Sequence, residues 1–178
     1  MQELINKVFG LIETPKWPGM FIFCVCVFSL GFALVSQYGF GLQPCILCIY
    51  QRWPFVVAGI LGFLAYWVSD RSFNGANILI MMCGAAFMVN TGIAMFHVGV
   101  EQEWWKGTEA CHLPDLSNID SPEAFMEMLE NAPLTPCTQP QWDFMGLTMA
   151  ALNVFLCFGM MVLSAFFSIF AVRKRNGF

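Results

Sequence analysis

Four stretches of this sequence are too long and too apolar to belong to an ordinary soluble domain. They cover about residues 17–36, 45–68, 76–96 and 146–172. A helix needs about 20 mostly apolar residues to cross the hydrocarbon core of a bilayer. Only 11% of the 178 residues are charged, whereas soluble domains contain about 25%. The sequence therefore predicts an all-α membrane protein, in which residues 1–178 form a single domain built on a four-transmembrane-helix bundle.

The one long polar segment, residues 98–145, is predicted to be a loop outside the membrane. It carries nine of the twelve acidic residues and only one of the eight basic ones. Within it, Ser121-Pro122-Glu123 is typical of a helix start. The apolar residues Phe125, Met128 and Leu129 that follow share one helix face. We therefore expect a short amphipathic helix in this loop, lying on the bilayer or against a partner.

The basic residues predict the orientation of the bundle, because Lys and Arg are retained on the cytoplasmic side of a membrane. Six of them fall on one side of a four-span arrangement: Lys7, Lys16, Arg71, Arg173, Lys174 and Arg175. Both termini are therefore expected in the cytoplasm, and the loop 98–145 on the opposite side. Residues 1–16 mix apolar and polar residues and are expected to form a short helix on the membrane surface. The net charge of −4 gives no indication of nucleic-acid binding.

The eight cysteines divide by this topology. Four of them face the non-cytoplasmic side, where disulfides persist, namely Cys45, Cys48, Cys111 and Cys137. The other four lie inside the spans and are expected to act as soft apolar packing, namely Cys24, Cys26, Cys83 and Cys157.

Cys45 and Cys48 form a Cys-x-x-Cys motif, the usual form of a redox dithiol because its small disulfide loop exchanges easily. Pro44 suits a helix start, so both cysteines are predicted to lie in the first helical turn, where free backbone N–H groups favour a thiolate. Arg52 follows Cys48 by four residues and lies on the same helix face. A permanent cation in apolar sequence indicates a function. We therefore predict that Arg52 stabilises the Cys48 thiolate, and that Pro54 kinks the helix just beyond it.

Two other interpretations of the exterior cysteines stay open from the residues alone. Cys111 and Cys137 could form a structural disulfide that closes the loop, as in many tetraspan proteins. The four cysteines could also bind zinc together with His97 and His112. Zinc is disfavoured because Cys111 and Cys137 lack close ligand spacing, the compartment is oxidising, and Arg52 would oppose a dication. We therefore predict no metal site.

The segment Cys45-Ile46-Leu47-Cys48-Ile49-Tyr50-Gln51-Arg52, after the first span, resembles the signature of the DsbB family of bacterial disulfide-forming membrane proteins. Cys111, Cys137 and the segment Gln141-Trp142-Asp143-Phe144-Met145-Gly146-Leu147 resemble the second periplasmic loop of that family and the entry to its last helix. The similarity extends from about residue 17 to the last span, with four cysteines in matching order. It implies a quinone-dependent thiol oxidase of the bacterial inner membrane.

The resemblance also implies a relay. A periplasmic thioredoxin-fold partner (DsbA-like) is expected to form a mixed disulfide with Cys111, and the freed Cys137 to pass electrons to the Cys45–Cys48 pair. Cys48 is then expected to face a membrane quinone, either ubiquinone or menaquinone. Arg52, one turn from Cys48, would stabilise both the thiolate and the negative charge that develops on the quinone oxygen. No phosphate-binding Gly-rich loop or flavin motif competes with the quinone.

Two histidines and one glutamine lie close in sequence to the motif cysteines or to the ends of the spans. His97 stands where the family often has a histidine near the quinone, and it is expected either to hydrogen-bond a quinone oxygen or to be an interfacial residue without chemistry. His112 could lower the pKa of Cys111 or be an ordinary loop residue. Gln51 departs from the family pattern, since some relatives have an acid there, so the pocket wall is expected to differ.

Two other functions remain open. One is a non-enzymatic tetraspan scaffold with structural loop disulfides. The other is a variant that serves one dedicated partner or runs in reverse as a carrier of reductant. The acidic loop would suit a partner with a basic surface.

Overall fold

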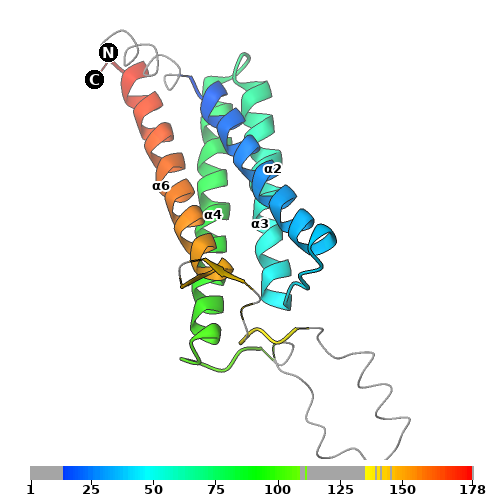
Figure 1. Cartoon of the computed structure of the whole chain (residues 1–178). Coiled ribbons are helices and arrows are strands. Elements are labelled where there is room, and N and C mark those ends of the chain that lie inside the picture. Colours follow the sequence, from blue (N-terminus) through cyan, green and yellow to red (C-terminus); the bar gives the residue numbers. More distant parts are fainter. Residues whose placement is uncertain are drawn as a thin grey trace, which may run out of the picture.

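The computed structural model describes residues 14–108, 111, 135–138, 140, 142–144 and 146–177. Within these ranges the chain forms four long helices, α2 (Lys16–Gly39), α3 (Ile46–Val68), α4 (Phe73–Glu101) and α6 (Met149–Arg175). Two short antiparallel strands, β1 (Asp143–Phe144) and β2 (Leu147–Thr148), precede α6. All four helices are long and apolar enough to cross a membrane. The predicted all-α, four-span membrane architecture is therefore confirmed (Figure 1).

The helix ends differ from the limits of the apolar stretches because capping residues set them. The last helix begins at Met149 rather than near residue 146, since the Thr148 hydroxyl accepts the backbone N–H of Ala151 at 3.2 Å. The third helix continues to Glu101 instead of ending near residue 96. Helix α3 runs through Pro54 without interruption. The surface helix expected over residues 1–16 falls almost entirely outside the described residues, and the amphipathic helix expected after Ser121 lies wholly outside them.

The helices pack mainly in chain order, with α2 against α3, α3 against α4, and α4 against α6 (Figure 1). Helices α2 and α6 touch each other much less. The interior between the helices is filled by apolar and small side chains, including Ile22, Phe55, Ile80, Phe87 and Met160. Three of the four cysteines expected as apolar packing, Cys26, Cys83 and Cys157, are buried in this core.

Helices α2 and α3 approach closely at a pair of glycines. A Cβ atom added to Gly19 would lie 2.8 Å from the carbonyl oxygen of Gly62, and one added to Gly62 would lie 2.9 Å from the carbonyl oxygen of Gly19. Small residues at helix contacts let backbones approach in membrane proteins, where packing is a main source of stability. This contact therefore fixes α2 against α3 near the start of α2.

Polar contacts join the loops and helix ends at this same end of the bundle. Lys16 Nζ lies 2.6 Å from Asp70 Oδ2, and Arg175 Nη1 donates to Asn74 Oδ1 at 2.8 Å. The start of α2, the turn between α3 and α4, and the end of α6 therefore lie together (Figure 1). This end carries most of the described basic residues, and the exterior cysteines lie at the other.

Candidate active site

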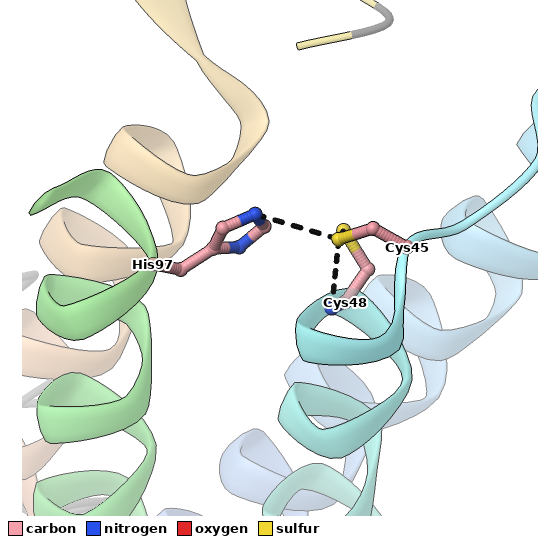
Figure 2. Close-up of side chains that lie close together, drawn as sticks. All are labelled: Cys45, Cys48 and His97. Carbon is pink, nitrogen blue, oxygen red and sulfur yellow. Dashed lines mark hydrogen bonds between the residues drawn. The ribbon is translucent and has the colours of Figure 1, made fainter. Parts of the chain in front are cut away.

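The dithiol is built at the start of α3. Cys45 is the N-cap of that helix, with extended backbone angles, and its sulfur accepts the backbone N–H of Cys48 at 3.4 Å. The prediction that Cys45 lies in the first turn is therefore wrong by one position, because its side chain takes the capping role. The sulfurs of Cys45 and Cys48 are 3.1 Å apart (Figure 2).

His97 reaches this dithiol from α4. Its Nε2 atom lies 3.4 Å from the Cys45 sulfur, as Figure 2 shows, and the residue is only 2% exposed. His97 lies within α4 rather than beyond its end, since the helix continues to Glu101. His97 is therefore buried, and one of its described contacts is with the thiol pair.

These contacts favour a thiolate on Cys45. Its sulfur already faces the backbone N–H of Cys48 and the ring nitrogen of His97, so we assign the Cys48 thiol as the donor between the two sulfurs. The hydrogen bond from Cys48, followed by the interactions with His97, holds the pKa of Cys45 well below the usual value for a thiol, although burial opposes this. A thiolate with lowered pKa is the nucleophilic form of a redox cysteine.

Arg52 makes a hydrogen bond that the sequence did not predict. Its Nη1 atom donates to Gln37 Oε1 at 2.7 Å, which joins the end of α2 to α3. The described polar contact between the dithiol and α4 is the one between Cys45 and His97. Arg52 nevertheless lines the same cavity as Cys48.

The second cysteine pair lies next to the first. Cys111 and Cys137 form a disulfide, and both are buried in one cluster with Cys45 and Val100. The backbone N–H of Cys137 also donates to the Cys111 carbonyl at 3.2 Å. The two pairs, far apart in the sequence, are therefore brought together.

The disulfide also bears on the zinc alternative. Cys45, Cys48 and His97 each offer one ligand atom within 4.8 Å of the others. The sulfurs of Cys111 and Cys137 are bonded to each other and so offer no thiolate. His112, the remaining ligand of that alternative, lies outside the described residues.

A cavity of about 690 Å³ lies between α2 and α6, next to the cysteines. Cys45, Cys48, Cys137, Arg52 and His97 line its polar part. Its walls are mostly apolar and come from both helices, including Phe21, Phe28, Phe32, Leu152 and Leu156. An apolar slot with a few polar groups at one end is typical of a site for a small hydrophobic cofactor.

Comparison with known proteins decides the family. Residues 15–167 match the family model described as Disulfide bond formation protein DsbB. The chain belongs to the DsbB family. A relative from Xylella fastidiosa (strain 9a5c), named Disulfide bond formation protein B, is 32% identical over 158 residues, which cover 86% of this chain and 89% of the relative. A protein of the same name from Azoarcus sp. (strain BH72) is 27% identical over 165 residues, covering 86% and 92%.

DsbB-family membership confirms the resemblance carried by the cysteine motif and supports a role in disulfide bond formation. Together with the four candidate spans, it supports a multi-pass membrane protein.

The contacts of three polar residues in this DsbB-family site were not predicted from the sequence, namely those of Gln51, Glu101 and Gln37. Gln51, treated only as part of the pocket wall, lies with its Nε2 atom 3.0 Å from His97 Nδ1. Glu101 is buried, with Oε1 3.7 Å from His97 Nε2, while its other oxygen accepts the Thr148 hydroxyl at 2.6 Å. The spacing of four residues between His97 and Glu101 was the available signal, because it places both on one helix face. Gln37, the acceptor for Arg52, had no comparable signal.

Proposed function

We propose that this protein oxidises the dithiol of a periplasmic, DsbA-like thioredoxin-fold partner and passes the electrons through its two cysteine pairs to a membrane quinone. The observation that carries the proposal is the common location of the pairs. Cys45, Cys111 and Cys137 pack in one buried cluster, and Cys48 packs against it. Cys45, Cys48 and Cys137 also line one cavity. A scaffold whose disulfides had only a structural role would not require the Cys111–Cys137 pair to lie beside the Cys45–Cys48 pair.

The first exchange involves the loop pair. A partner thiolate attacks the Cys111–Cys137 bond, forms a mixed disulfide with Cys111 and releases Cys137 as a thiolate. The second partner thiolate then attacks the mixed disulfide and releases Cys111. The partner leaves with a new disulfide, and its two electrons remain on Cys111 and Cys137.

The second exchange returns the loop pair to its oxidised form. One loop thiolate attacks the Cys45–Cys48 disulfide, and the other closes the Cys111–Cys137 bond. Cys45 and Cys48 then hold the two electrons as a thiolate and a thiol.

The residues around the cavity fit a quinone. The apolar side chains of α2 and α6 suit its ring and isoprenoid tail, and Arg52 supplies a permanent positive charge near Cys48. When bound, ubiquinone or menaquinone supplies an acceptor for two electrons and two protons. Arg52 would orient the quinone through an oxygen atom, and the buried His97–Glu101 pair can hold a proton at the edge of the cavity. The proposal places the protein in the bacterial inner membrane with the cysteines periplasmic and both termini cytoplasmic. The basic end of the bundle supports this orientation.

The test mixes the purified protein in detergent with a reduced thioredoxin-fold dithiol protein and a short-chain quinone, and follows the quinone absorbance. We expect rapid quinone loss in the wild type, none with Cys48→Ser, and much slower loss with Arg52→Met. Cys83→Ala is the matched control, because this buried cysteine contacts only the core and a backbone carbonyl of α3. No quinone loss with any partner, while the loop disulfide resists mild reductant, would favour the scaffold instead.

A further inference from the structure

A file of hydrogen-bonded polar side chains runs from the dithiol into the membrane-spanning part of the bundle. It begins at His97, whose Nδ1 atom lies 3.0 Å from Gln51 Nε2. Gln51 Oε1 in turn accepts Asn153 Nδ2 at 2.6 Å. The Cys157 thiol donates to Asn153 Oδ1 at 3.2 Å, and Asn90 Nδ2 donates to the Cys157 sulfur at 3.2 Å. The file therefore links α3, α4 and α6 side chain by side chain.

The side chains of this file lie inside the membrane-spanning bundle, where polar atoms without hydrogen-bond partners are unfavourable. Gln51 is 6% exposed, Asn90 and Cys157 are fully buried, and all lie within helices apolar enough to span a membrane. Buried polar groups in a bilayer destabilise a fold unless they are paired, and they commonly mark function. Asn90 Oδ1, at the far end, has no hydrogen-bond partner among the described residues. Simple packing would not require such a file.

The file has a direction, which follows from the chemistry of amides. An amide side chain has a donor end and an acceptor end, so fixing one end fixes the other. Because Asn153 donates to Gln51 Oε1, Gln51 presents its N–H group to His97 Nδ1. Nδ1 must then accept, and a neutral imidazole carries its proton on Nε2. Nε2 is the nitrogen that faces the Cys45 sulfur.

The other groups around His97 agree with this assignment. Glu101, on the same helix, presents an oxygen 3.7 Å from Nε2 and is itself an acceptor for Thr148. Cys48 and Cys45 face the ring from the start of α3, while Arg52 is bonded to Gln37. A protonated Nε2 therefore meets two acceptors, and every donor of the file points toward Cys45. Aligned hydrogen bonds polarise one another in a low-dielectric interior.

We propose that Gln51 and Asn153 are positioning residues that hold His97 in its Nε2–H tautomer, so that His97 donates to the thiolate of Cys45. The inference rests on the proposed function, in that Cys45 and Cys48 are taken as the redox pair. It adds that Gln51 and Asn153, which lie within the membrane-spanning helices, favour the thiolate of Cys45 indirectly, by orienting His97.

The first test reads the tautomer directly and needs no change to the file. The chain has two histidines, so His112→Asn leaves His97 as the single site for ¹⁵N-histidine labelling of the reduced protein in micelles. We expect an unprotonated Nδ1 and a protonated Nε2. Protonation of Nδ1, in either the neutral or the charged ring, would overturn the proposal.

The second test measures how the alkylation rate of Cys45 depends on pH, resolved by peptide mapping. Gln51→Leu removes the donor to Nδ1, and Asn153→Asp, at neutral pH, makes the Gln51 amide turn round. Both are expected to move the midpoint of the alkylation profile upward by about one pH unit, the effect of losing one hydrogen bond to a charged group.

Asn77→Leu is the matched control, because Asn77 is another buried asparagine of α4 and lies outside the file. Its profile should equal the wild type. Wild-type profiles in both Gln51→Leu and Asn153→Asp would overturn the proposal. Neither readout uses a quinone or a partner protein, so a failure of quinone reduction would count against the proposed function and leave this inference standing.

Discussion

The Cys45 sulfur accepts the backbone N–H of Cys48 at 3.4 Å, so a cysteine of the proposed redox pair is also the N-cap of helix α3. The N-terminus of a helix carries partial positive charge, which favours a negative group at this position. The same contact therefore serves the helix and the thiolate. It allows the structural role of Cys45 to be separated from its chemistry.

Serine and alanine at position 45 should differ in stability. Cys45→Ser retains a capping acceptor, whereas Cys45→Ala loses it, and loss of an N-cap destabilises a protein by about 0.5–2 kcal/mol. We expect the alanine variant to be less stable than the serine variant by this amount, measured as the free energy of unfolding in mixed micelles. Both should be inactive in quinone reduction. Equal stability would show that the cap contributes nothing.

The reactivity of Cys45 should be nearly independent of pH between 8 and 6. An ordinary thiol, with a pKa of about 8.5, loses about tenfold in alkylation rate per unit over this range. The pKa of Cys45 is lowered, first by Cys48 and then by His97, so its thiolate is lost only as the pH falls through that lower value. The stabilisation of the reduced protein by this thiolate should weaken progressively as the pH falls from about 8.5, the pKa of an unfolded-state thiol, to that lower value.

Removing His97 should raise the pKa of Cys45 only part of the way toward that of an ordinary thiol, because Cys48 still lowers it. His97→Phe keeps an aromatic ring but not its hydrogen bond, and we expect the midpoint of the Cys45 alkylation profile to move upward by about one pH unit. Thr91→Val is a suitable control on the same helix, since the Thr91 hydroxyl bonds only the Phe87 carbonyl of its own helix, at 2.8 Å. A His97→Phe protein with the wild-type pH profile would contradict the assigned contact.

Arg52 should affect quinone binding more than thiol reactivity. Its described hydrogen bond goes to Gln37 and its side chain lines the cavity. We expect Arg52→Met to raise the KM for quinone by about tenfold, the value of one charge-assisted hydrogen bond of about 1.5 kcal/mol. Cys45 alkylation should stay unchanged. The opposite result, slower alkylation with an unchanged KM, would place Arg52 on the thiolate, as the sequence alone suggested.

The glycine contact between α2 and α3 should tolerate no side chain. Gly19→Ala would place a Cβ atom 2.8 Å from the Gly62 carbonyl oxygen, while Gly31→Ala on the same helix meets nothing within 4 Å. Overpacking of this kind destabilises proteins by about 1–3 kcal/mol. We expect a lower melting temperature for Gly19→Ala only. Equal melting temperatures would mean that the two helices can move apart.

The fold was largely predictable, because the length and hydropathy of each span are properties of contiguous sequence. The Cys-x-x-Cys motif and the last two exterior cysteines were found for the same reason. What could not be predicted were contacts that depend on how each helix is rotated about its axis. The hydrogen bond from Arg52 to Gln37 joins α3 to α2 and was not predicted. The contact between His97 and Cys45 joins two helices, and hydrophobicity alone does not set their relative rotation.

The loop disulfide also constrains the position of the loop. In the proposed relay each turnover opens the Cys111–Cys137 bond, so this covalent constraint is lost while the loop cysteines are reduced. The described hydrogen bonds that do not depend on this bond include one from the Cys137 N–H to the Cys111 carbonyl and one from the Thr135 hydroxyl to the Gln43 carbonyl, both 3.2 Å. The second of these ties the loop to the residues just before Cys45. A freed Cys137 would therefore search a small volume beside its target, and the exchange would proceed at a high effective concentration.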